Sequence, residues 1–245
     1  VEFPLGVFGI AIATVILPAL SKKYSNQDLT GFKSTIKYAI TLAIIFSLPA
    51  MFGLIVLSQT IISSLFQYGS FDLFDTNMSS LSLIAYSIGL PAFIIMKVLL
   101  TGFFSRQDTK TPVKYGIYAI IFNVTMNLSV VIYYTYNPFI GAHAFLALAT
   151  SFSAWIQVIL LYLHLKRIEI IQENLFLNTI NLKALLSCAF MTVLLLLILM
   201  PINDWVTKEY YMRGLMLLFY ITIGGLAYIA SIYTLGFRYK KDLTI

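Results

Sequence analysis

Charge and cysteine are scarce in this sequence, and each shortage excludes a class of protein. Only 11% of the 245 residues are charged, while 60% are hydrophobic, which is far from the mixture found in soluble globular domains. The single cysteine, Cys188, lies inside an apolar run, so the chain has no disulfide framework. We therefore expect an integral membrane protein.

Groups that carry catalysis are equally sparse. The two histidines, His143 and His164, have no Cys, Asp or Glu at the spacing of a metal site or a catalytic triad. The pair Gly224–Gly225 lies within an apolar stretch, so it does not form a loop that cradles a phosphate. The sequence argues against an enzyme and assigns no metal ligands. We expect both histidines to be interface residues.

Long apolar runs make up most of the chain. Seven stretches of at least 18 predominantly apolar residues lie at 3–20, 36–57, 76–104, 113–136, 142–165, 182–202 and 212–237, and each is long enough to cross a bilayer as a helix. The short alternating segments typical of a membrane barrel do not occur. The sequence thus predicts an all-α integral membrane protein with seven transmembrane helices.

Basic residues predict the orientation of these helices. Thirteen Lys and Arg fall in or beside the loops on one side, two fall on the other, and Lys97 lies inside a span. The net charge of +6 is therefore explained by retention of short basic loops in the cytoplasm rather than by nucleic-acid binding. We expect the N-terminal end outside and the C-terminus in the cytoplasm.

The chain divides at its longest connection without a membrane run. This connection covers 168–181, so we expect one unit over 1–167, a cytoplasmic linker over 168–181 and a helix pair over 182–245. The sequence begins at Val1 and enters apolar sequence almost at once, with no signal peptide before it. We expect that an N-terminal part of the protein is missing here.

Two charged residues within the spans are candidates for substrate binding. Lys97 stands nine residues before Arg106, which is about 13 Å deeper along a helix. It is either a lysine that snorkels to the headgroups or a cation that faces an internal cavity and meets an anionic substrate. Glu2 is either an outer-surface charge or one half of a charged pair in such a cavity.

Polar residues also gather in the middle of two spans. Asn123 and Asn127 are four residues apart and share a helix face, and Thr150 lies in the next span. They either form hydrogen bonds between helices or bind a small cation through their oxygens. Thr150 belongs to a stripe of small residues with Ala147, Ser151 and Ala154, which predicts close packing against another helix.

A compact charged turn separates two of the longest apolar runs. It comprises Arg106, Gln107, Asp108, Thr109, Lys110, Thr111 and Pro112. Thr111 is a good N-cap and Pro112 suits the first helical position, so we expect the next helix to begin there. We further expect Asp75 to cap the third span and 58–66 to lie along the membrane interface.

Three stretches carry a resemblance to a known family. They are PLGVFGIAIATVILPALSK at 4–22, LFQYGSFDLFDT at 65–76 and KVLLTGFFSRQDTKTPVK at 97–114. They closely resemble the MurJ (MviN) family of lipid II flippases, strongly over 1–167 and by hydropathy alone beyond. The resemblance implies a 14-helix, MATE-like transporter of the multidrug/oligosaccharidyl-lipid/polysaccharide (MOP) exporter superfamily. The seven spans would be its helices 8 to 14, and the N-terminal lobe would be their missing partner.

The same resemblance implies a function. Members move lipid II, the undecaprenyl-pyrophosphate-linked muropeptide, from the inner to the outer leaflet of the bacterial cytoplasmic (inner) membrane by alternating access. Glu2 matches a family glutamate that follows an essential arginine, and an apolar groove at the last two helices holds the lipid tail. No cofactor is implied except a coupling cation, Na⁺ or H⁺, for which Asn123, Asn127 and Thr150 are the candidates by position. Asn127 stands where a carboxylate can occur, which leaves coupling open.

Two alternatives remain beside this function. One is another exporter of the superfamily, for a polysaccharide-lipid or a drug, and the turn at 106–112 argues against it. The other is a membrane scaffold that does not transport.

Overall fold

The computed structural model describes residues 1–171 and 179–237 of the chain. Within these residues, seven helices are long and apolar enough to cross a membrane, which confirms the predicted all-helical membrane fold. In chain order the elements are α1 (Glu2–Pro4), the π-helix η1 (Leu5–Ile10), α2 (Ala11–Ser25), α3 (Leu29–Val56), α4 (Ser58–Phe66), α5 (Leu73–Phe104), α6 (Lys110–Tyr136), α7 (Ala142–Arg167), α8 (Thr179–Ile198), α9 (Ile202–Trp205) and α10 (Tyr210–Thr234). The first three run on as a single span of 24 residues.

Two helices begin earlier than hydrophobicity alone predicts, because aspartates cap them. The carboxylate of Asp28 accepts the backbone N–H of Gly31 at 2.8 Å, so α3 begins seven residues before its apolar run. Asp72 and Asp75 form a capping box that starts α5. Asp75 is therefore the third helical residue, and our prediction of Asp75 as the N-cap is wrong by one turn. Residues 58–66 form the short helix α4, and their position along the membrane interface stays a prediction.

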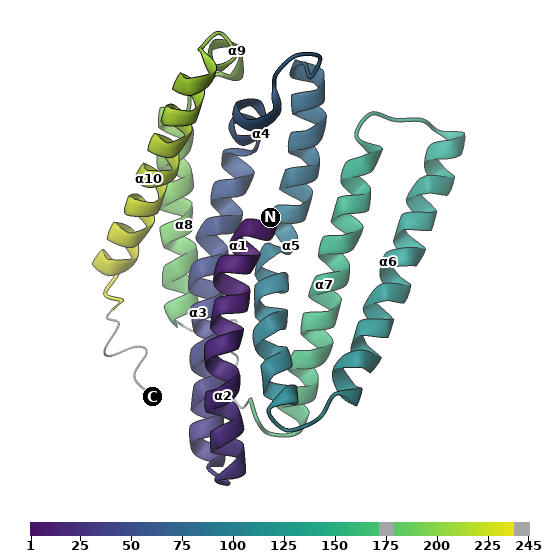
Figure 1. Ribbon diagram of the computed structural model, residues 1–245, viewed down its shortest axis with the longest axis vertical. Helices are drawn as coiled ribbons and strands as arrows, with labels where there is room; N and C mark the ends of the chain where they lie inside the picture. The colour runs from purple at the N-terminus through teal and green to yellow at the C-terminus, as the bar shows by residue number, and fades with distance from the viewer. Residues whose placement is uncertain (172–178, 238–245) are drawn as a thin grey trace.

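The long helices stand side by side, with α5 in the middle (Figure 1). A core of buried apolar side chains joins α2, α3, α5 and α7. The hairpin of α6 and α7 extends to one side, and α6 packs mainly on α7. The pair α8 and α10 lies on the opposite side against α3 (Figure 1). The outermost helix, α6, is consequently exposed along nearly its whole length.

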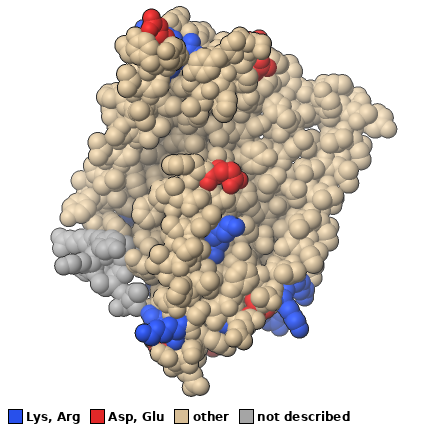
Figure 2. All heavy atoms as spheres, viewed as in Figure 1, with Lys and Arg blue, Asp and Glu red and all other residues tan. Residues whose placement is uncertain are grey.

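The ends of the bundle differ in charge. The α2–α3 turn, the α5–α6 loop and the end of α7 lie at one end, while α4, α9 and the α6–α7 loop lie at the other (Figure 1). Lys and Arg gather near the first end, and most of the face between carries no charge apart from one acidic and one basic patch (Figure 2). The loops that sequence assigns to one side therefore share one end. Residues 172–178 of the predicted linker and the basic residues after 237 lie outside the described residues, and the division into three parts stays a prediction.

The predicted small-residue stripe is a tight seam between α5 and α7. Ala147, Ser151 and Ala154 are all buried. The Ser151 hydroxyl donates to the carbonyl of Ala85 at 2.7 Å, and a Cβ added at Gly89 would lie only 2.6 Å from the Ser151 Oγ. The two backbones approach this closely because small residues face each other.

A second apolar cluster attaches α8 and α10 to α3. Its polar element is Tyr228 on α10, whose hydroxyl donates to the carbonyl of Ile45 at 2.8 Å. In a regular helix that carbonyl accepts the N–H four residues later, which here is Pro49, and proline has none. Tyr228 thus satisfies a buried carbonyl that the α3 sequence leaves unpaired.

We expect Tyr228→Phe to destabilise the protein by about 1–3 kcal/mol, because a buried carbonyl without a partner carries that cost. Unfolding in a denaturing detergent, followed by tryptophan fluorescence, measures the change. Tyr233→Phe is the matched control, since Tyr233 lies on α10 and is exposed. Equal stability of the two variants would contradict the role given to the Tyr228 hydroxyl.

Candidate functional site

Lys97 lies on the least covered stripe of the half of α5 that ends at Phe104. Phe93, Lys97 and Leu100 are half-buried and Phe104 is exposed, whereas the residues between them are mostly buried. Lys97 lies seven residues before the end of the helix, or about 10 Å into the span. No ion pair or hydrogen bond is recorded for its amine within the described residues. A lysine at this depth on an uncovered stripe is available to an anion.

Glu2 lies on the neighbouring first span, and its side chain is exposed. Gly9 of that span packs against Ile94 of α5, which fixes the register between the two parallel helices. Glu2 precedes Gly9 by seven residues, and Lys97 follows Ile94 by three. At 1.5 Å per residue the two charges are therefore roughly 15 Å apart along the bundle. The structure does not bring them together as an ion pair.

The start of α1 also corrects an expectation. We expected Glu2 near the outer face, but the chain starts part-way along the bundle, short of the end that carries α4 and α9 (Figure 1). The bundle extends beyond the start of α1 because the last part of α3, which ends at Val56, and the first part of α5, which begins at Leu73, form that end.

An apolar groove of about 490 Å³ runs between the first span, α3 and the α8–α10 pair. Phe3 and Pro4 border it directly after Glu2, and Phe8 stacks on Phe46 at 5.0 Å between ring centroids. Gly225 of α10 opens into it, because nothing lies within 4 Å of a Cβ added there. The groove can hold a flexible hydrocarbon chain beside the charged start of α1.

The two asparagines and Thr150 meet as predicted. The Asn123 amide donates to Thr150 Oγ1 at 3.3 Å, and the Asn127 amide donates to Asn123 Oδ1 at 3.1 Å. The hydrogen bond between α6 and α7 is thereby confirmed. The Oδ1 of Asn127 is buried and has no partner, so one oxygen of the cluster is free for a further ligand. No group of three or more His, Cys, Asp or Glu in the described chain is placed to hold a metal.

The turn at 106–112 closes one helix and opens the next. Gln107 adopts a left-handed conformation with φ of 61°. The N–H of Asp108 bonds to the carbonyl of Phe103 at 3.1 Å, which completes a Schellman end for α5. The Asp108 carboxylate then accepts the N–H of Thr111 at 3.0 Å. One aspartate thus links both helices.

This geometry corrects the predicted start of α6. The helix begins at Lys110 with Thr109 as N-cap, so Thr111 and Pro112 are its second and third residues. The capping oxygen comes from Asp108 rather than from Thr111. Pro112 remains compatible with the first turn, whose N–H groups have no partner within the helix.

The end of the bundle that carries this turn is tied together by His164 of α7. Its Nδ1 lies 3.0 Å from the hydroxyl of Tyr115 on α6, and its ring centroid lies 5.6 Å from that of Phe103 on α5. His164 therefore connects three helices beside the turn. His143, at the other end of α7, bonds to the carbonyl of Met78 on α5.

The environment of Asp108 sets a pH dependence. Burial alone would raise the pKa of its carboxyl, but hydrogen bonds from Thr111 and the charges of His164 and Arg106 together hold the pKa below the ordinary value. A carboxyl with a depressed folded-state pKa stabilises the folded protein above its unfolded-state pKa, and the contribution is lost as pH falls through the folded-state value.

We expect Asp108→Ala to lower stability by about 1 kcal/mol at neutral pH, the usual cost of a lost helix cap. The deficit should shrink as the pH falls below about 4, the ordinary pKa of an aspartate, and should disappear only below the depressed pKa of the folded protein, where the wild-type carboxyl is protonated too. Thermal unfolding across a pH series measures it. Asp204→Ala, in α9 at the opposite end, is the control. A deficit that does not depend on pH would contradict the capping role of the carboxylate.

These features define a polytopic all-α membrane protein with a lysine inside its spans and an apolar groove beside them. The family model for the lipid II flippase MurJ matches residues 1–216. The chain belongs to the MurJ family.

Individual relatives agree with this assignment. The chain is 42% identical over 243 residues to the probable lipid II flippase MurJ of Vibrio cholerae serotype O1, covering 98% of this chain and 44% of the relative. It is 34% identical to the probable lipid II flippase MurJ of Haemophilus influenzae, and the match covers 99% of this chain and 47% of the relative. A solved lipid II flippase MurJ in an inward closed conformation superposes with a TM-score of 0.72 at 26% identity, covering 99% and 46%. The chain spans about half the length of the relatives that it matches.

Proposed function

We propose that this chain takes part in moving lipid II from the inner to the outer leaflet of the bacterial cytoplasmic membrane. Its relatives carry the name lipid II flippase. The observation that carries the proposal for this chain is Lys97, a cation within a span that has an uncovered side and no recorded partner in the described residues.

The physical chemistry of the substrate supports this role. A pyrophosphate cannot cross hydrocarbon without compensation, and a lysine amine offers it charge-assisted hydrogen bonds. The polyprenyl tail is apolar and is stable in an apolar environment, which the groove between α1, α3 and α10 provides. Head and tail would thus be held on adjacent parts of one face while the protein alternates its access.

The orientation follows from the basic loops. We propose that the end with the α5–α6 loop faces the cytoplasm, because Lys and Arg are retained on that side. Lys97 would then meet its substrate in the inner half of the membrane, where lipid II is delivered. Cysteine-accessibility labelling at Thr109→Cys and at Tyr136→Cys, both exposed positions, in intact cells and in inverted vesicles, tests this orientation.

The experiment that tests the function is complementation. The gene for the native protein should restore growth to a bacterium depleted of its own lipid II flippase. Failure of a protein that is present in the membrane would count against lipid II and in favour of another exported substrate or a scaffold role.

We further propose that the cluster of Asn123, Asn127 and Thr150 holds a coupling cation. The unpaired, buried Oδ1 of Asn127 supports this, since amide and hydroxyl oxygens are suitable ligands for small hard cations. The competing role is a hydrogen bond between α6 and α7 alone.

A substitution series at Asn127 separates the two roles. Asn127→Asp should strengthen Na⁺ dependence of transport about tenfold, because a carboxylate binds the cation more strongly, whereas Asn127→Ala should remove the dependence. Transport rates in vesicles with Na⁺ or K⁺ provide the measurement. Thr125→Ala is the control, because its hydroxyl bonds only to the carbonyl of Ile121 on its own helix. The cation site would be refuted if wild-type transport were equally fast in Na⁺ and K⁺ and Asn127→Ala were fully active.

A further inference from the structure

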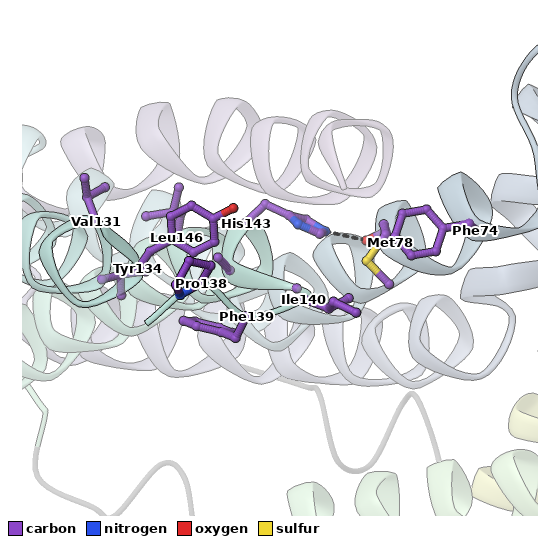
Figure 3. Close-up of a pocket in the computed structure, with 12 residues that line it drawn as sticks. Phe74, Met78, Val131, Tyr134, Pro138, Phe139, Ile140, His143 and Leu146 are labelled. Atoms are coloured by element: carbon purple, nitrogen blue, oxygen red, sulfur yellow. Dashed lines mark hydrogen bonds between the residues drawn. The ribbon is translucent and has the colours of Figure 1, made fainter. Parts of the chain in front are cut away.

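A second pocket lies at the opposite end of the bundle from Lys97. It has a volume of about 700 Å³ and is formed where α5 begins, α6 ends and α7 begins, with the α6–α7 loop beside it. Figure 3 shows Phe74 and Met78 on one side, Val131, Tyr134 and Leu146 on the other, and His143 between them. None of its lining residues is Lys, Arg, Asp or Glu.

The walls are held in place by specific contacts. The Nε2 of His143 donates to the carbonyl of Met78 at 2.7 Å, which ties the start of α7 to α5 (Figure 3). Phe139 packs edge-on against Tyr134 and Phe145, with ring centroids 6.0 and 5.5 Å away. The pocket is therefore a defined feature of the fold, with an apolar interior.

The pocket continues the exposed apolar face of α6. Its α6 wall belongs to a candidate membrane span, and that helix exposes large apolar side chains along its length, including Val124, Leu128 and Val131. Tyr133, Tyr134 and Tyr136 follow at the end of the helix, which is where tyrosines mark the level of lipid headgroups. The hollow thus begins at headgroup level and reaches into the hydrocarbon between α5 and α6.

We propose that this pocket binds one acyl chain of a phospholipid from the leaflet at the α6–α7 end, the outer leaflet in the orientation proposed above. Water is a poor occupant, because a buried water needs two to four polar partners and the walls offer few. Bilayer hydrocarbon lies next to the opening and matches the walls in polarity. Tyr134 and His143 stand at the headgroup level, where an ester or phosphate would lie. The bound chain fills the space between α5 and α6, which touch each other little.

The test uses the native protein in phosphatidylethanolamine–phosphatidylglycerol vesicles that contain a phosphatidylethanolamine with a diazirine on its acyl chain. After illumination, mass spectrometry locates the lipid adducts. Met78 and Leu146, inside the pocket, should be labelled along with the exposed Leu226 and Ile229 of α10. The last two report ordinary contact with the bilayer.

Two valines on α6 give a matched pair of variants. Val131 lines the pocket and Val124 lies one heptad before it, and they are 51% and 48% exposed, so either position tolerates a larger side chain. Val131→Trp should reduce labelling of Met78 and Leu146 about tenfold, because each methylene kept out of the pocket costs roughly fourfold in binding. Val124→Trp should leave it unchanged, and labelling of Leu226 should be constant in both.

Several results would overturn the proposal. One is labelling inside the pocket that Val131→Trp does not change, which would indicate bilayer contact without a site. Another is the absence of lipid adducts at Met78 and Leu146 while α10 is labelled, as expected if a protein partner fills the pocket.

Discussion

Lys97→Met is expected to slow transport of lipid II strongly while the protein still inserts into the membrane. A hydrogen bond to a charged group contributes about 1.5–3 kcal/mol, and its loss at the pyrophosphate corresponds to a reduction of about 10- to 150-fold in transport efficiency. Methionine keeps the length and apolar stem of lysine, so packing on α5 should survive. Growth of a flippase-depleted strain at matched protein levels measures the effect.

Two further variants separate substrate binding from snorkelling. Lys114 lies in the first turns of α6, outside the proposed site, with its amine 6.0 Å from the ring centroid of Tyr118. Lys114→Met should retain activity, and Lys97→Arg should restore part of it because the charge remains. If Lys97→Met and Lys114→Met both support full growth, Lys97 serves only as an anchor at the headgroups.

Gly89→Leu is expected to prevent folding. A Cβ at this position would lie 2.6 and 2.8 Å from the Oγ and Cβ of Ser151 and 2.9 Å from Phe93, so a larger side chain forces α5 and α7 apart. Even Gly89→Ala should destabilise the protein by about 1–3 kcal/mol, the usual cost of overpacking a core. The amount of folded protein recovered in mild detergent, followed by thermal unfolding, measures both.

The Gly89 variants require a control for the effect of glycine on helix propensity and a second substitution that compensates for the clash. Gly214 has nothing within 4 Å of an added Cβ, so Gly214→Ala should leave stability unchanged or raise it. Adding Ser151→Gly to Gly89→Ala removes two of the three atoms in conflict and should recover part of the loss, as a double-mutant cycle would report. Absence of coupling between the two positions would contradict the packing described for the seam.

The sequence predicts the fold well where one local signal suffices. All seven spans were predicted from apolar length, because the bilayer requires that length of every spanning helix. The starts of α3 and α5 were not, since Asp28 and Asp72 add polar turns before the apolar runs begin. The local signal for the start of α5 is an aspartate at position 72 followed three residues later by a second acid, and apolar length alone does not detect it.

The sites are predictable only in part, for a related reason. Asn123, Asn127 and Thr150 lie at helical spacings and on consecutive spans, so their contact follows from local pattern. The bond from Tyr228 to the carbonyl of Ile45 joins residues far apart in the chain. Pro49 leaves that carbonyl without its helical partner, but nothing in the sequence points to Tyr228 as its donor.

The pocket at the α6–α7 end was missed for the same kind of reason. It requires three helix ends to meet, and no residue in it departs from an ordinary apolar pattern. Only His143, a polar residue at the start of a span, hinted at a contact there.

The central claim is tested most directly by translocation of fluorescent lipid II in vesicles that contain the native protein. A membrane-impermeant reagent quenches the lipid II that reaches the outer leaflet. We predict that wild-type vesicles expose lipid II initially confined to the inner leaflet and that Lys97→Met vesicles do so at least about tenfold more slowly. Wild-type vesicles no faster than protein-free vesicles, or Lys97→Met as fast as wild type, would contradict the account.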